Sequence, residues 1–174
     1  TGAYHRLLCR EFALVARIFV GRSGGVDSSV AAALLVEQGH DVTGVYMKNW
    51  SEDVPGMQCP WADDVADAKR VAVSLGIDFR VFDFQKEYKQ RVVDAMVAEY
   101  KAGRTPNPDV MCNQEIKFHL FLEAALEQGA DMIATGHYAR GQKKELAQGA
   151  RLLRAKDTEK DQTYFLYRVH EVAL

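Results

Sequence analysis

The chain has 174 residues, of which 48% are hydrophobic and 26% are charged, the proportions of an average globular protein. This length allows one domain with its own hydrophobic core, and the composition excludes a disordered, collagen-like or coiled-coil protein. A formal net charge of −2 excludes a uniformly basic nucleic-acid-binding surface, so any contact with RNA has to come from local patches.

Apolar runs are short, and none approaches the roughly 20 residues that cross a bilayer, so we expect no membrane partner. The three cysteines, Cys9, Cys59 and Cys112, stand far apart without zinc-site spacing, and we assign no metal ligands. A sparse, odd count fits a reducing compartment, so we expect a cytoplasmic protein. Residues 1–15 form an N-terminal extension of unclear origin, which leaves a mitochondrial location open.

The first part of the chain alternates strands with helices. An apolar run at 18–20 predicts a buried strand that ends beside a glycine cluster, and helical spacing of apolar residues predicts a helix over 26–38. A strand over 42–47, a polar loop over 49–60 and a helix over 64–75 follow.

The same alternation continues in the second part. We predict a strand over 77–84, a helix over 88–102, a helix over 113–128 after a Pro-rich loop, and a strand over 132–135. Each helix is closed by a glycine. A polar turn over 142–148 then predicts a hairpin or a flexible excursion. Strands separated by helices indicate an α/β fold, an open parallel sheet with helices on both faces and ligands at the carboxyl ends of the strands.

A glycine-rich and serine-rich turn joins the first strand to the first helix. The residues that we predict to bind nucleotide there are Gly21, Arg22, Ser23, Gly24, Gly25, Val26, Asp27 and Ser28. Backbone amides and the positive helix end favour an anion at such a turn, and adjacent glycines let the backbone approach phosphate oxygens. The turn has no lysine after its glycines, so it is no kinase-type P-loop, and it does not fit the G-x-G-x-x-G pattern.

The string SGGVDS at 23–28 resembles the PP-loop of the ATP pyrophosphatase superfamily, which has an adenine nucleotide alpha hydrolase-like fold. That superfamily splits ATP between its first two phosphates and transfers AMP to a substrate oxygen. The resemblance implies ATP and Mg²⁺ as cofactors and places Asp27 beside the metal-bound pyrophosphate. Arg22 departs from the family, where this position is usually small or apolar, and its long cation either reaches a phosphate or obstructs the adenine pocket.

Four longer strings resemble the tRNA 2-thiouridylases in order and spacing. They are GVYMKNW at 44–50, GRTPNPDVMCNQEIKF at 103–118, ATGHYAR at 134–140 and KDQTYFLY at 160–167. The resemblance implies nucleotide contacts for Met47 and Gly136, which end the second and fourth predicted strands. From the residues alone, Met47 is equally well an ordinary core methionine.

Cys112 is the candidate nucleophile, with Asp27 as the other predicted catalytic residue. It comes directly before the helix predicted over 113–128, where helix-end amides lower a thiol's pKa and favour the thiolate. A single cysteine in such a position is more often a small buried hydrophobe, and it is the surrounding motif that favours catalysis.

The resemblance also implies residues that contact tRNA. Asn107, Pro108 and Asp109 match the segment that touches the target base, and two prolines stiffen their loop. The other predicted contacts are His137, Lys160, Asp161 and Gln162. From sequence alone, the last three are also explained as solvated charges at a helix start. The surrounding excess of lysine and arginine suits a phosphate backbone.

These matches imply a tRNA 2-thiouridylase that adenylates the carbonyl oxygen of the anticodon wobble uridine and replaces it with sulfur. A donor protein supplies the sulfur as a persulfide on a second cysteine, and Cys112 completes release through a disulfide with it. That cysteine is expected beyond the sequence given, since we interpret 16–174 as a PP-loop ATP-binding domain truncated before the family's central and C-terminal domains. We therefore expect the chain to bind ATP without thiolating tRNA alone. The alternatives are a PP-loop amidotransferase or ligase, and a catalytically incomplete ATP-binding module.

Overall fold

The computed structural model describes residues 15–22, 25–50, 61–143 and 150–173. Four residues discussed above lie outside this described part, namely Cys9, Ser23, Gly24 and Cys59. Almost all of the predicted N-terminal extension also lies outside it. Among the described residues, no helix combines the length and the apolar character needed to span a membrane.

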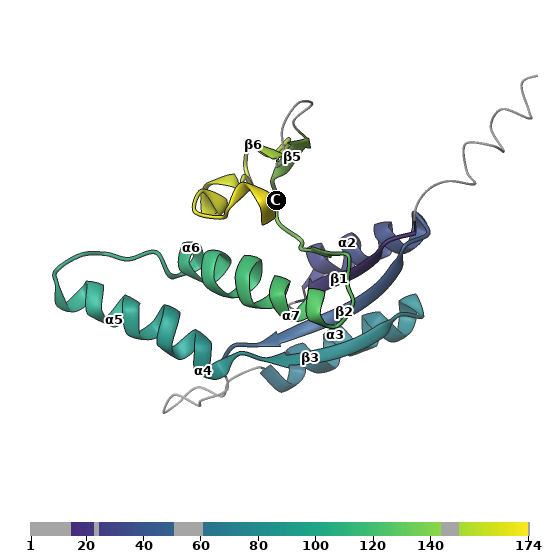
Figure 1. Ribbon diagram of the computed structural model, residues 1–174, viewed down its shortest axis with the longest axis horizontal. Helices are drawn as coiled ribbons and strands as arrows, with labels where there is room; N and C mark the ends of the chain where they lie inside the picture. Colours follow the sequence, from purple (N-terminus) through teal and green to yellow (C-terminus); the bar gives the residue numbers. More distant parts are fainter. Residues whose placement is uncertain (1–14, 23–24, 51–60, 144–149, 174) are drawn as a thin grey trace, which may run out of the picture.

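Four parallel strands form the central sheet (Figure 1). They are β1 (Arg17–Arg22), β2 (Asp41–Lys48), β3 (Asp78–Asp83) and β4 (Met132–Ala134). Their order in the sheet is β3-β2-β1-β4, so the chain builds outward from β1 to β3 and then returns to the other side of β1. The strand order therefore reverses between β1 and β4, which is where open α/β sheets bind their ligands.

Alternating side chains of β1 supply both hydrophobic cores. Phe19 points to one face, where it packs in a cluster with Phe82 and Phe121. Ile18 and Val20 point to the other face, where they pack against residues of the helices. Because successive side chains of a strand point to opposite faces, a sheet covered on both sides requires consecutive apolar residues, as at 18–20 of β1.

Helices cover both faces of the sheet, as the sequence predicts (Figure 1). On the side of Ile18 lie α2 (Val26–Glu37) and α3 (Trp61–Leu75). The face of Phe19 is covered by two longer helices with π-helical middles. Their segments are α4 (Gln85–Tyr88), η1 (Lys89–Val93) and α5 (Asp94–Lys101) in the first, and α6 (Pro108–Cys112), η2 (Asn113–Leu120) and α7 (Phe121–Glu127) in the second. The predicted fold class is confirmed.

The largest error in the predicted boundaries is at the start of the helix that precedes β4. We predict a helix from residue 113, but α6 begins at Pro108 and continues without a break into η2. The Asn107 side chain accepts hydrogen bonds from the amides of Asp109 and Val110, and proline at the first helical position has its φ already set for a helix. An asparagine followed by a proline is therefore a helix start here, not a loop.

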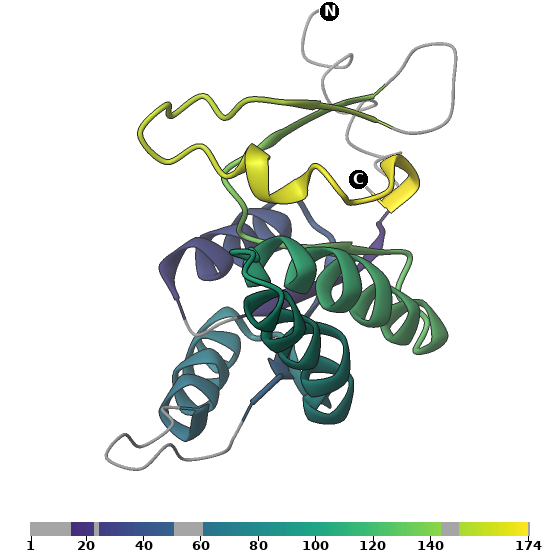
Figure 2. The ribbon, with the colours of Figure 1, turned by 90° about the vertical axis from the view of Figure 1, so that its left-hand side faces the viewer.

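The segment beyond the sheet contains a hairpin and two short 3₁₀ helices. Strands β5 (Arg140–Lys143) and β6 (Ala150–Leu153) pair antiparallel, which confirms the hairpin alternative. They are followed by η3 (Thr163–Leu166) and η4 (Glu171–Ala173). Figure 2 shows this segment as a layer above the helices and the sheet. It brings residues from the end of the chain close to the carboxyl ends of β1 and β4.

Candidate functional site

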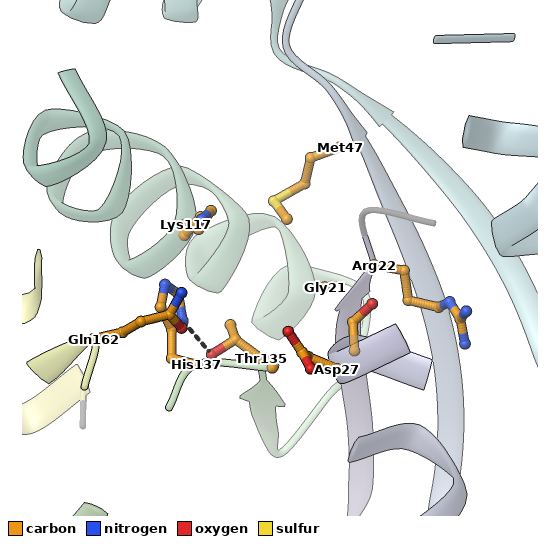
Figure 3. A pocket seen from close by; sticks show the side chains of 10 residues that line it. Gly21, Arg22, Asp27, Met47, Lys117, Thr135, His137 and Gln162 are labelled. Carbon is orange, nitrogen blue, oxygen red and sulfur yellow. Dashed lines mark hydrogen bonds between the residues drawn. The ribbon is translucent and has the colours of Figure 1, made fainter. Parts of the chain in front are cut away.

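A cleft of about 190 Å³ opens at the carboxyl ends of β1 and β4 (Figure 3). It lies at the point where the strand order reverses. Its lining combines strand ends, the first turn of α2, the η2 helix and the C-terminal layer. The lining residues are Gly21, Arg22, Asp27, Ser28, Met47, Lys117, Thr135, Gly136, His137 and Gln162. Six of the residues predicted to bind nucleotide thus come together at one place with two of the predicted tRNA contacts, His137 and Gln162.

The first turn of α2 forms one wall of the cleft. Its N-cap is Gly25, and no side chain in the described part of the chain caps the helix or competes for the amides at its positive end. The hydroxyls of Ser28 and Ser29 donate to the Gly25 carbonyl oxygen at 3.3 Å and 2.8 Å. In this conformation the two hydroxyls therefore tie the turn together.

Gly136 allows the end of β4 to lie directly against this turn. A Cβ atom at Gly136 would be 2.7 Å from the Ser28 nitrogen and 2.8 Å from the Asp27 carbonyl carbon, both of them backbone atoms. A side chain at this position would therefore collide with protein backbone. Gly21 makes room for Met47 in a similar way, because a Cβ there would be 3.0 Å from the Met47 Cε atom.

The Arg22 side chain lies on the opposite face of the sheet from Met47. It is 1% exposed, passes over Gly44, and donates from Nη2 to the Ser29 hydroxyl at 2.7 Å. Nε and Nη1 have no hydrogen-bond partner among the described residues, and burial lowers the pKa of the guanidinium. Figure 3 shows the guanidinium pointing away from Met47 and Asp27, so in this conformation it does not obstruct the pocket.

The Asp27 carboxylate is held by two side chains from distant parts of the chain. Tyr138 donates its hydroxyl to Oδ1 at 3.0 Å, and Lys160 donates from Nζ to Oδ2 at 2.9 Å. Nζ also lies 4.2 Å from the centre of the Tyr138 ring. The hydrogen bond from Lys160 is the main reason that the pKa of Asp27 is lowered, and Asp27 in turn raises the pKa of Lys160.

Asp161 and Gln162 attach the C-terminal layer to the sheet. Gln162 accepts from the Tyr138 amide through Oε1 at 3.0 Å and donates its own amide to the Tyr138 carbonyl at 2.9 Å. Asp161 accepts from Arg154 Nε and from the amides of Ala155 and Thr163. The hydrogen bond from Arg154 is the first cause of its strongly lowered pKa. We predict that Asp161 and Gln162 are solvated or contact tRNA. In the structure both form hydrogen bonds within the protein.

His137 links the end of β4 to the η2 helix. Its Nδ1 lies 2.7 Å from the Thr135 hydroxyl, and its Nε2 lies 3.1 Å from Asn113 Oδ1. Asn113 also donates from Nδ2 to the Phe165 carbonyl. A neutral imidazole with its proton on Nε2 satisfies every member of this chain, and burial lowers the pKa of His137 to about 4. Both ring nitrogens of this predicted tRNA contact are therefore engaged inside the domain.

Cys112 does not line the cleft. The helix begins at Pro108, so Cys112 lies past the first turn, and its thiol packs against the core around Phe19. Burial raises the pKa of the thiol, a nearby Asp109 raises it further, and Lys117 only partly opposes this. The expectation that helix-end amides favour the thiolate is therefore wrong in this conformation, because the thiol sits too far along the helix and too deep.

Asn107, Pro108 and Asp109 lie at the start of the same helix and are also outside the cleft lining. Asn107 additionally donates from Nδ2 to the Tyr164 hydroxyl at 3.1 Å.

Four residues of the site were not predicted, namely Lys117, Thr135, Tyr138 and, behind His137, Asn113. Thr135 and Tyr138 flank the end of the fourth predicted strand, and that position could have indicated them. Asn113 and Lys117 lie on a helix, and only the packing of that helix reveals their role. In the described part of the chain, no three His, Cys, Asp or Glu residues are grouped so as to hold a metal ion by themselves.

Comparison with known proteins places this site in a family. The family model described as "tRNA methyl transferase HUP domain" matches residues 16–174. The chain is 60% identical to the tRNA-specific 2-thiouridylase MnmA of Akkermansia muciniphila over 154 residues, which cover 87% of this chain and 42% of that protein. It is 54% identical to the protein of the same name from Thiobacillus denitrificans, over 91% of this chain and 44% of that one.

The chain thus spans less than half the length of these relatives. Among solved structures, a predicted subunit of tRNA methyltransferase from Methanocaldococcus jannaschii aligns with a TM-score of 0.49 at 16% identity, over 75% of this chain and 56% of that chain. This likeness is too loose to support an inference. The family model, in contrast, matches residues 16–174, almost the whole chain. The chain therefore belongs to the tRNA methyl transferase HUP domain family, and the relatives described above are tRNA-specific 2-thiouridylases.

Proposed function

We propose that the chain is the ATP-binding part of a tRNA 2-thiouridylase that acts in the cytoplasm on the wobble uridine of the anticodon. The observation that carries the proposal is the uncapped first turn of α2, which faces a cleft at the strand-order reversal and carries Asp27. Helix amides at such a position bind phosphate groups. The names of the two relatives above support tRNA as the substrate.

The residues present fit ATP with Mg²⁺. Gly136 lets the end of β4 lie directly against the first turn of α2, where a Cβ atom would collide with the backbone of Asp27 and Ser28. Mg²⁺ is commonly held by one or two carboxylates together with phosphate oxygens, which a lone Asp27 can satisfy. Bound ATP would supply the AMP group that turns a uracil carbonyl oxygen into a departing phosphate monoester.

The chain's own residues then have separate tasks. The α2 amides would stabilise the charge that develops on pyrophosphate, and Asp27 would hold the metal beside it. A persulfide on a second cysteine attacks the base carbon as AMP leaves. The Cys112 thiolate next attacks the sulfur of that cysteine, so that a disulfide forms and the base keeps the outer sulfur. The persulfide comes from a donor protein.

Calorimetric titration with ATP and Mg²⁺ tests the nucleotide half of this proposal. Asp27→Ala should abolish the Mg²⁺-dependent part of ATP binding. Asp63→Ala is the matched control, because Asp63 occupies the first turn of α3 as Asp27 does that of α2. An absence of heat from the unmutated chain would contradict ATP binding at this site, and unchanged binding by Asp27→Ala would remove Asp27 from the site.

The Cys112→Ser variant tests the proposed sulfur transfer to tRNA. The substitution is made in the full-length protein, because we do not expect the chain alone to thiolate tRNA. In an assay of 2-thiouridine formation on tRNA, we expect the variant to convert ATP to AMP while forming no product. An amidotransferase or ligase needs no nucleophilic cysteine and forms no 2-thiouridine, so equal ATP turnover by the unmutated protein and the variant, without 2-thiouridine from either, would favour that alternative.

A further inference from the structure

The phosphate turn has no lysine of its own within 25–29, although the triphosphate it would hold carries several negative charges. Three described cations lie close to the cleft. Arg22 is buried on the far face of the sheet, and Lys117 projects from η2 on the other side. Lys160 reaches the first turn of α2 itself, through its hydrogen bond with Asp27.

Contacts with two residues, Asp27 and Tyr138, hold the Lys160 ammonium in place. Nζ lies 2.9 Å from Asp27 Oδ2 and 4.2 Å from the centre of the Tyr138 ring, and the Tyr138 hydroxyl holds the other oxygen of Asp27. The backbone of Tyr138 is in turn fixed by paired hydrogen bonds with Gln162. The ammonium is therefore placed beside the uncapped amides of α2 before any ligand arrives.

The Lys160 side chain also remains accessible to a ligand. It is 47% exposed and its partner Asp27 is 36% exposed, so a phosphate can approach both. An ammonium group has three donors, and the hydrogen bond with Asp27 uses one of them. Without this cation, the Asp27 carboxylate would repel a triphosphate that approaches the same turn.

We propose that Lys160 is the triphosphate-binding lysine of this site, delivered from 133 positions along the chain to a loop that lacks one. It would contact the outer phosphates as the lysine of a Gly-Lys-Ser/Thr loop does. This inference rests on the proposed function, since it requires ATP at the α2 turn. The same ammonium could instead bind an RNA phosphate, so the test uses nucleotide in the absence of RNA.

The test is calorimetric titration of the Lys160→Gln variant with ATP and Mg²⁺, and separately with adenosine. We expect ATP to bind roughly 10- to 100-fold more weakly, as loss of a charge-assisted hydrogen bond implies, with adenosine affinity unchanged. Lys160→Arg should keep most of the affinity. Lys156→Gln removes an equal charge from an exposed neighbour in the same segment and should change affinity less than twofold.

ATP affinity that is unchanged or higher in Lys160→Gln would overturn the inference and leave Lys160 as a partner of Asp27 or of RNA. An Asp27→Asn background shows whether Lys160 contacts the triphosphate or only neutralises the Asp27 carboxylate. With that carboxylate removed, the loss of ATP affinity caused by Lys160→Gln should persist if Lys160 contacts a phosphate. Its disappearance would contradict a direct contact. If the unmutated chain gives no heat with ATP, the proposed function fails; if it gives heat that Lys160→Gln leaves intact, only this inference fails.

Discussion

The two regions that carry the proposed chemistry present their groups in opposite ways. The phosphate end, made of the carboxyl ends of β1 and β4 with the first turn of α2, offers uncapped amides and the Asp27 carboxylate to an open cleft. The cysteine helix, residues 108–127, keeps the Cys112 thiol partly buried with a raised pKa. The first region already presents its groups to the cleft, whereas the Cys112 thiol needs a change of surroundings before it can react.

Gly136→Ala is the substitution that we expect to disturb the phosphate end most. The added Cβ would meet the backbone of Asp27 and Ser28, which cannot move without displacing the α2 turn. We expect loss of ATP binding by calorimetry and a decrease in the free energy of unfolding of about 1–3 kcal/mol in urea.

Gly141→Ala serves as the control, because no atom lies within 4 Å of a Cβ built there. Its free energy of unfolding should change by less than about 0.5 kcal/mol. Normal ATP binding by Gly136→Ala would show that the two backbones need not be so close.

The connection between the two regions is His137, and its effect should depend on pH. Its pKa of about 4 lies below the ordinary 6.5, so the unfolded chain takes up the proton more readily. The stabilisation by neutral His137 is therefore complete above pH 6.5 and is lost as the pH falls towards 4, by up to about 3 kcal/mol.

Urea unfolding at several pH values checks this, with His137→Gln as the comparison. The other histidines are common to both proteins, so the difference between the two curves isolates His137. Parallel curves between pH 6.5 and 4 would mean that His137 is not buried as a neutral member of the Thr135–Asn113 chain.

The smallest expected effect is on the rate of Cys112 alkylation by iodoacetamide. Because burial raises the pKa of the thiol above its ordinary value, the rate in a Cys9→Ser, Cys59→Ser background should still be rising at pH 9. A rate that levels off below pH 8 would show a thiolate already activated, and the contrast between the two regions would disappear.

The sequence predicts the phosphate end well because local features determine it. An apolar strand, a glycine-rich turn and an amphipathic helix locate Gly25 and Asp27 without knowledge of distant contacts, and the sheet topology follows from the βαβ alternation. Positive φ angles of 67° to 86° at Gly39, Gly76, Gly103 and Gly129 confirm the predicted helix ends for the same reason.

Long-range packing determines the rest, and the pattern of residues does not contain it. The contact of Lys160 with Asp27 and that of His137 with Asn113 join residues at least 24 positions apart. The burial of Cys112 depends on which face of its helix packs against the sheet. Asn107 was a local signal, and the helix start that it caps could have been predicted from the Asn-Pro pair.

The most direct measurement is a crystal structure of the chain with Mg²⁺ and a non-hydrolysable ATP analogue. The account predicts the triphosphate within hydrogen-bonding distance of the amides at 25–27, with the metal on Asp27 and the Lys160 ammonium against an outer phosphate. A triphosphate bound at another place, with these amides left free, would contradict it.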